Sequence, residues 1–297
     1  MLRRLGYACL SAEHGDLSPR GVILRNATPE RLRELIRLNL TNLASLLRRN
    51  AARSIRLFRI SSDVIPFASH PVNEIPWWRE FQSNLGEIAE IIRAEDIRVS
   101  MHVGPYTTLS APNGQTLAAS VRDLEYHARF LDEVTSDLSH KIIVHGGGVY
   151  GDKAASMERW CENVSSLPVD IRGRLTIEND ERLYAVQDAL HLALAVKIPL
   201  VFDVFHHRVF TGHSADVPTW LEVAARTWHP KDGVPKIHYS SQAEGARPGA
   251  HAEYVSSAEF QNFLTITRDG PVFDCMLEAK AKDRALLALR GNLHLAA

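Results

Sequence analysis

A short run near the middle of the chain joins an apolar stretch to one acid and two imidazoles. Residues 200–207 read Leu-Val-Phe-Asp-Val-Phe-His-His and follow directly on Pro199. The apolar start suits a strand that is buried on both faces. Titratable groups at the end of such a strand cost desolvation free energy unless a partner neutralises them, and a metal ion commonly pairs Asp with His. A strand end with solvated polar residues is an equal alternative for this run alone.

Apolar runs of strand length alternate with helical patterns along residues 1–297, without a break in composition. Thr28 and Pro29, for example, supply the cap and the first position of a helix. This alternation predicts a parallel sheet, and about eight units favour a single-domain α/β fold, the (β/α)8 TIM barrel, over an open doubly wound sheet. A long loop that contains His251 separates the last two strands. The predicted strands cover residues 5–10, 55–60, 98–102, 141–145, 175–180, 200–207, 236–240 and 272–278, and the predicted helices cover 29–47, 78–95, 117–138, 154–164, 185–196, 218–228 and 282–293.

Side chains that can bind metals recur at the C-terminal ends of these strands or in the loops that follow. In a (β/α)8 barrel those ends meet at one mouth, so we expect the side chains to converge there. Each of them alone is explained as well by a hydrogen-bonded histidine or a surface acid, and only the set predicts a metal site. In chain order the mouth residues are Tyr7, His70, His102, His145, Glu178, Asp203, His206, His238, His251 and Glu278.

The donor types in this set are imidazole and carboxylate, without a thiolate. Such donors suit manganese or zinc, and they suit magnesium less because of the histidines. The donors exceed one octahedral sphere, so the sequence predicts two or three divalent ions. Two ions roughly 3.5–4 Å apart form a clamp for in-line displacement at phosphorus, where one activates a water and the others stabilise the leaving oxygen. This chemistry needs no Ser–His or Cys–His pair.

Composition narrows the possible partners. Lys and Arg total 34 against 35 Asp and Glu, and a formal net charge of −1 gives no overall attraction to polyanions. The arginines at 48, 49, 53, 56 and 59 are predicted to form a solvated helix end rather than a nucleic-acid patch. The three cysteines lack a CxxC spacing, which favours a reducing cytoplasm over a disulfide framework. No run has the length of a membrane span, and the absence of G-x-G-x-x-G and Walker motifs argues against a nucleotide cofactor.

Several distinctive motifs follow one another in order over nearly the whole chain. They are Leu5-Gly6-Tyr7-Ala8-Cys9, Arg59-Ile60-Ser61-Ser62-Asp63 with Ala68-Ser69-His70, Ser100-Met101-His102, Ile177-Glu178-Asn179-Asp180, Asp203-Val204-Phe205-His206-His207, Lys236-Ile237-His238 and Met276-Leu277-Glu278-Ala279-Lys280. These motifs resemble those of the UV damage endonucleases. The resemblance implies a barrel related to the apurinic-site endonucleases of the endonuclease IV type. It also implies a manganese cluster that nicks damaged double-stranded DNA immediately 5′ of UV photoproducts and of some other lesions such as abasic sites.

The resemblance also implies roles for individual residues. Glu178, Lys236, His70 and His238 match active-site residues, and the lysine is one that family members can carry in carboxylated form. Contacts to the lesion or the DNA are implied at Tyr7, Tyr106 and Ser11. The implied metal ligands are His102, His145, Glu178, Asp203, His206, His238, His251 and Glu278.

Two positions depart from the family pattern. Pro105-Tyr106 stands where a Gln-Tyr pair is usual, and Ser11 stands where an Asn is usual. Both changes concern lesion recognition and leave the metal donors untouched. The missing Gln and the near-zero net charge keep open a metal-dependent sugar or sugar-phosphate isomerase or epimerase of the xylose isomerase type. A non-catalytic DNA-binding module is a third alternative. A monomer is the simplest expectation, because the mouth of the barrel must admit a duplex.

Overall fold

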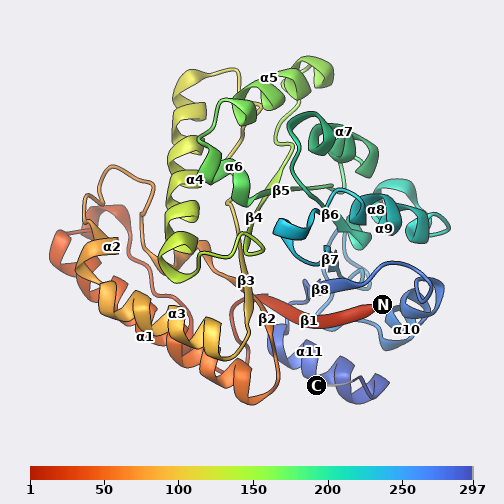
Figure 1. Ribbon diagram of the computed structural model, residues 1–297, viewed down its shortest axis with the longest axis horizontal. Helices are drawn as coiled ribbons and strands as arrows, with labels where there is room; N and C mark the ends of the chain where they lie inside the picture. Colours follow the sequence, from red (N-terminus) through yellow and green to blue (C-terminus); the bar gives the residue numbers. More distant parts are fainter. Residues whose placement is uncertain (296–297) are drawn as a thin grey trace.

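The computed structural model describes residues 1–295, in which eight parallel strands close into a barrel (Figure 1). Each strand pairs with its neighbour in sequence, and the first strand pairs with the last, so the sheet has no free edge. The predicted (β/α)8 barrel is therefore confirmed. The strands are β1 Leu2–Cys9, β2 Leu57–Ile60, β3 Arg98–His102, β4 Lys141–His145, β5 Leu175–Glu178, β6 Leu200–Asp203, β7 Lys236–Tyr239 and β8 Phe273–Leu277.

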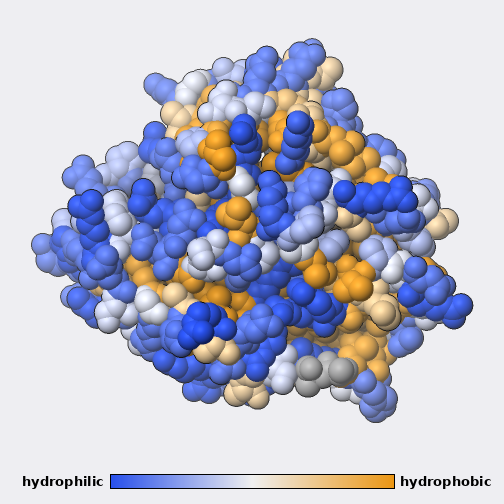
Figure 2. Space-filling model, viewed as in Figure 1, coloured by the Kyte–Doolittle hydropathy of each residue, from blue (hydrophilic) through white to orange (hydrophobic). Residues whose placement is uncertain are grey.

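Helices surround the strands (Figure 1). Hydrophilic residues cover most of the face seen in Figure 2, with apolar side chains visible in smaller groups between them. Within residues 1–295, no helix combines the length and the apolar character needed to cross a bilayer. The helices are α1 Pro29–Ala52, α2 Trp77–Glu80, α3 Gln82–Ala94, α4 Gly114–Val134, α5 Lys153–Ser165, α6 Val169–Arg174, α7 Val186–Val196, α8 Val204–Thr211, α9 Val217–Ala225, α10 Ser257–Ile266 and α11 Lys282–Leu293, with short 3-10 turns η1 Gly15–Leu17, η2 Leu24–Asn26, η3 Ser62–Val64 and η4 Pro230–Asp232.

Alternation along the strands decides which side chains enter the barrel. Tyr7 and Phe58 are register partners and belong to the large core between strands and helices. Their chain neighbours Ala8 and Leu57 pack with Met276 in a separate small cluster. Successive strand residues point to opposite faces, so this cluster lies inside the barrel. The residues that share its face therefore form the inner wall and the mouth.

The sixth predicted strand is half as long as expected. Strand β6 ends at Asp203, and the next residues form α8 instead of continuing the strand to residue 207. The cause is local, because the Asp203 carboxylate accepts a hydrogen bond from the backbone N–H of His206 at 2.7 Å and caps the helix. The turn of α8 then brings His206 back over the strand end.

The long loop predicted between the last two strands contains α10, which the sequence reading missed. Ser256 caps this helix and accepts from the N–H of Glu259, while Phe260 and Phe263 are buried. A Ser followed three residues later by Glu, with apolar residues at helical spacing, is a recognisable helix start. The sequence therefore contains the start of α10, but the preceding stretch with glycines and alanines favoured the interpretation as a loop.

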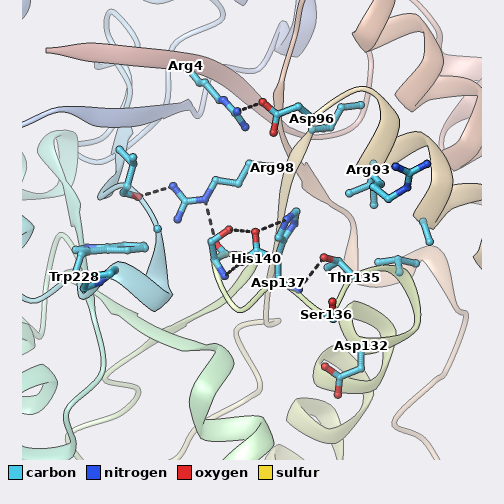
Figure 3. Close-up of a pocket in the computed structure, with 18 of the residues that line it drawn as sticks. Arg4, Arg93, Asp96, Arg98, Asp132, Thr135, Ser136, Asp137, His140 and Trp228 are labelled. Atoms are coloured by element: carbon cyan, nitrogen blue, oxygen red, sulfur yellow. Dashed lines mark hydrogen bonds and ion pairs between the residues drawn. The ribbon is translucent and has the colours of Figure 1, made fainter.

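A pocket of about 1060 Å³ lies at the end of the barrel opposite the mouth (Figure 3). Arg98, at the start of β3, points into this region, and its guanidinium lies 5.4 Å from the centre of the Trp228 ring. His140 lines the same pocket, and its Nδ1 accepts a hydrogen bond from the N–H of Val99 at 3.0 Å. This end of the barrel is therefore held together by buried polar contacts.

We expect His140 to make the protein sensitive to mild acid. Burial lowers the pKa of His140 to about 3, against the opposing charge of Asp137. In the unfolded chain a histidine has a pKa of about 6.5. Between the pKa of the folded protein and that of the unfolded chain, the unfolded chain therefore binds a proton that the folded protein does not bind. The contribution of neutral His140 to the free energy of unfolding is thus fully present above about pH 6.5. Below this pH the free energy of unfolding falls by up to about 1.4 kcal/mol per pH unit.

The variant His140→Asn tests this effect. Its amide oxygen can replace Nδ1 as the acceptor for Val99, but it does not titrate. Between pH 7 and pH 4.5 we expect the variant to lose about 2 kcal/mol less stability than the wild type in urea unfolding. His191→Asn, at an exposed site on α7, is the matched control and is expected to follow the wild type. Equal acid dependence in all three proteins would contradict the assignment.

Candidate metal centre

Glu178, at the end of β5, lies at the centre of the mouth. Its side chain is 1% exposed. One carboxylate oxygen lies 3.2 Å from His102 Nε2 and 3.8 Å from His145 Nε2, and the other lies 2.8 Å from His238 Nδ1 and 3.8 Å from His206 Nδ1. Strands β3, β4 and β7 and the first turn of α8 thus place imidazoles around one acid.

Two overlapping groups of three residues could each hold an ion. Their ligand atoms lie within 4.8 Å of one another in each group. Glu178 is the member they share, so its two oxygens can serve both positions. The groups are His102, His145 and Glu178, and Glu178, Asp203 and His238.

Glu278 follows β8 and extends the site on the other side of His238. Its Oε1 lies 3.2 Å from His238 Nδ1, and its Oε2 lies 3.9 Å from His251 Nδ1. Arg59 of β2 donates to the same carboxylate at 2.5 Å. The prediction that Arg59 belongs to a solvated helix end is therefore wrong. It lies in a strand, and alternation directs its side chain into the barrel.

Backbone carbonyls orient three of the histidines. The Nδ1 of His102 lies 2.9 Å from the oxygen of Val103, that of His206 lies 3.0 Å from the oxygen of Asn179, and that of His251 lies 2.6 Å from the oxygen of Glu278. A carbonyl only accepts, so Nδ1 carries the proton in each ring. In the neutral ring Nε2 then keeps its lone pair, which is the arrangement of histidines that ligate metals.

Burial and neighbouring charges shift the pKa values of the acids and histidines at the mouth. Burial alone raises the pKa of a carboxyl group, but the imidazoles of His238 and His145 hold the pKa of Glu178 well below its ordinary value. Burial and the charge of Glu178 raise the pKa of Asp203 to about 6, against the charge of His206. His206 is buried too, yet the charges of Asp203 and Glu178 raise its pKa to about 9. Asp203 and His206 therefore bind protons more tightly than usual, and a divalent cation would compete with those protons for the same atoms.

Several buried polar atoms at the mouth have no hydrogen-bond partner among the described residues. They are Asp203 Oδ2, His238 Nε2 and His145 Nδ1. An unpaired buried polar atom costs about 1–3 kcal/mol and calls for an explanation such as an ion. Imidazole nitrogen and carboxylate oxygen are donors that manganese and zinc accept. The residues present therefore fit divalent metal ions.

Comparison with known proteins decides the family. The sequence model described as UV-endonuclease UvdE matches residues 3–296. The chain belongs to the UV damage endonuclease family. A UV DNA damage endonuclease of Clostridium perfringens (strain 13 / Type A) is 35% identical over 281 residues, which are 94% of this chain and 68% of that protein.

Solved structures agree with this family. The crystal structure of SacUVDE superposes with a TM-score of 0.89 at 33% identity and covers 98% of this chain and 99% of that one. Endonuclease IV from Thermus thermophilus has a TM-score of 0.61 at 14% identity over 99% of this chain and all of that one, a likeness in fold alone. The predicted membership of the UV damage endonucleases is confirmed, and so is the relation in fold to endonuclease IV.

Lys236 lies in the barrel below the metal donors. It precedes His238 by two residues on β7, so both side chains face inward. Its Nζ has no hydrogen-bond partner among residues 1–295, and burial together with the charge of Arg98 lowers its pKa well below the ordinary value. The side chain is thus a buried amine whose charged form is disfavoured.

Two of the residues implied to contact DNA lie away from the mouth. The Tyr7 ring is completely buried, and its hydroxyl donates to Asn50 Oδ1 on α1 at 2.8 Å. The expectation that Tyr7 faces the mouth is wrong, because this position of β1 points outward. Ser11 is also buried, and its hydroxyl donates to Asp283 on α11. Both side chains connect the start of the chain to helices, and neither is free to touch a duplex.

His70 and Tyr106 lie at the rim instead. His70 is exposed, its Nδ1 accepts from the N–H of Val72 at 3.1 Å, and it belongs to neither group of three donors. Tyr106 is 65% exposed. Both line a cleft of about 640 Å³ beside the mouth. Their positions are accessible to a duplex, while the roles implied for them stay predictions.

Asn179 is a supporting residue that the sequence reading did not single out. Its side-chain oxygen accepts from the N–H of Asp203 at 2.9 Å, and its amide donates to the oxygen of Asp203 at 3.0 Å. Its backbone oxygen is the one that orients His206. Asn179 thus joins the ends of β5 and β6. Its place directly after Glu178 was the only sign of this role in the sequence.

Proposed function

We propose that this endonuclease nicks damaged double-stranded DNA immediately 5′ of UV photoproducts, and also of other lesions such as abasic sites, with two or three divalent ions. The observation that carries the proposal is the donor set around Glu178, which belongs to both groups of three. The mixture of imidazole and carboxylate favours manganese over zinc and magnesium. The ligands we propose are His102, His145, Glu178, Asp203, His206, His238, His251 and Glu278.

The chemistry follows from what these side chains hold. Ions bound there would supply Lewis-acid charge at the scissile phosphate and lower the pKa of an attacking water. Glu178 keeps its negative charge in the buried mouth because His238 and His145 hold its pKa low. Arg59 orients Glu278 and offsets part of its charge. Burial lowers the pKa of the Lys236 amine well below its ordinary value, and carboxylation of this amine would add a further anionic donor at the floor of the site.

Substrate selection is proposed to rest on distortion of the duplex. Flipping a damaged base costs less free energy than flipping a paired one. An exposed aromatic ring such as Tyr106 can stack on a base without reading its sequence. Pro105 offers no amide to hydrogen-bond the bases, so stacking carries more of the recognition. We propose that the protein acts as a monomer, because the mouth must receive a duplex. We also propose that it acts in the cytoplasm.

A nicking assay tests this proposal and its metal dependence. A duplex with one defined photoproduct, a duplex with one abasic site and an undamaged control are incubated with protein and manganese, and then with a chelator. We expect incision directly 5′ of the photoproduct, reduced at least about 100-fold on chelation, since the ions supply several kcal/mol of transition-state stabilisation. Undiminished nicking with the chelator would contradict the metal mechanism. If no duplex is incised, the result would favour the isomerase alternative, which family membership disfavours.

A further inference from the structure

A buried carboxylate outside the metal centre connects two loops of the rim. Asp123 of α4 is 2% exposed. Its Oδ1 accepts a hydrogen bond from the Ser69 hydroxyl at 3.0 Å, and its Oδ2 accepts one from the Thr107 hydroxyl at 2.7 Å. No Lys or Arg side chain of residues 1–295 pairs with it, and His127 Nδ1 lies 3.6 Å from Oδ2 but donates its hydrogen bond to the backbone oxygen of Asp123 at 2.7 Å. A buried charge is costly without donors, so both hydroxyls must stay in place to satisfy it.

The two donors are chain neighbours of the two rim residues. Ser69 precedes His70 in the segment between η3 and α2, and Thr107 follows Tyr106 in the loop between β3 and α4. Both rim residues and Asp123 line the cleft of about 640 Å³. The carboxylate therefore joins the two sides of that cleft at positions next to the side chains that can face DNA.

The same helical turn also reaches the metal centre. The Tyr126 hydroxyl donates to the oxygen of Ser62 at 2.8 Å, and His127 Nε2 lies 3.0 Å from the Ser62 hydroxyl. That hydroxyl donates to the backbone oxygen of His102 at 2.5 Å. One face of α4 thus holds the His70 segment, the Tyr106 loop and the strand end that carries a metal donor.

We infer that Asp123 is a positioning residue that sets Tyr106 and His70 relative to the metal centre for lesion recognition. This role rests on the proposed function. The Tyr106 ring packs against Gly104, where a Cβ atom would clash with it, so the position of the ring depends on the course of this loop. Without the Thr107 hydrogen bond, the loop must be ordered when the duplex binds, and the free-energy cost appears as weaker binding.

Matched variants separate this role from a purely structural one. Thr107→Val removes the hydroxyl at constant shape, Thr107→Ser keeps it, and Thr116→Val changes an exposed threonine on α4. Steady-state nicking of the photoproduct duplex gives kcat and KM, while bound manganese and the melting temperature are measured on the same samples. We expect Thr107→Val to raise KM about tenfold with kcat within about twofold. Metal content should not change, and the Ser and Thr116 variants should behave as wild type.

A double-mutant cycle then assigns the effect to the carboxylate. Asp123→Leu, which removes both acceptor oxygens, should raise KM at least as much as Thr107→Val, and the double variant should be no worse than Asp123→Leu alone, because both changes break one contact. The positioning role is overturned by an unchanged KM in Thr107→Val, by full additivity, or by a loss that follows metal content or melting temperature. A wild-type protein that nicks no lesion overturns the proposed function first, and the positioning role with it.

Discussion

Replacing Glu178 with glutamine is expected to abolish incision while the fold is kept. Glu178 contacts His102 and His238 and belongs to both groups of metal donors. Glutamine has the same shape but lacks the charge, and its amide donates where a metal ligand must provide a lone pair. We expect at least about a 1,000-fold loss of kcat, which corresponds to about 4 kcal/mol of transition-state stabilisation.

Two measurements distinguish this loss from misfolding. Bound manganese, determined on the dialysed protein, is expected to fall in Glu178→Gln, while the circular dichroism spectrum stays that of the wild type. Glu80→Gln is the control, because that acid pairs with Arg33 on the outer surface, remote from the donors. A Glu178→Gln protein that keeps its metal and nicks within about tenfold of the wild type would contradict the assigned centre.

Replacing Arg98 with leucine is expected to cause the largest loss of stability, about 3–5 kcal/mol. The guanidinium is 3% exposed and donates to backbone oxygens of Ser139, Val234 and Asp232, at 3.1, 2.5 and 3.0 Å. It also donates to Asp274 Oδ2 at 2.8 Å. Leucine would leave three carbonyls and part of a buried carboxylate without this donor.

Arg3 provides the matched control, because it binds the same carboxylate from the surface. Its side chain is 37% exposed and forms two hydrogen bonds to Asp274, at 2.8 and 2.6 Å. Arg3→Leu is expected to cost about 1 kcal/mol, as solvent can replace an exposed donor. Urea unfolding at pH 7 compares the two variants with wild type. Similar urea midpoints for the two variants would contradict the prediction that burial makes the loss of Arg98 more costly than the loss of Arg3.

The sequence alone was sufficient where the signals are local. The bounds of β3, β4 and α11 agree with the predicted ranges, and Thr28 caps α1 as its type and position indicate. Buried parallel strands are short apolar runs, and helix starts have specific capping residues, so both can be read without a partner. Among the predicted metal donors, those that form the two groups of three lie at or next to the ends of strands: His102, His145, Glu178, Asp203 and His238.

Only the tertiary structure decided which way each strand-end side chain faces. Tyr7 and Arg59 lie near the C-terminal ends of adjacent strands, yet the tyrosine points out to α1 and the arginine points in to Glu278. A shift of one residue in a strand exchanges its two faces, and the sequence leaves that phase open wherever both faces are buried. The contacts of Asp123 with Ser69 and Thr107 likewise join residues that come together only in the folded barrel. The sequence thus determined the barrel and the kinds of donor, while closure of the sheet determined which side chains reach the mouth.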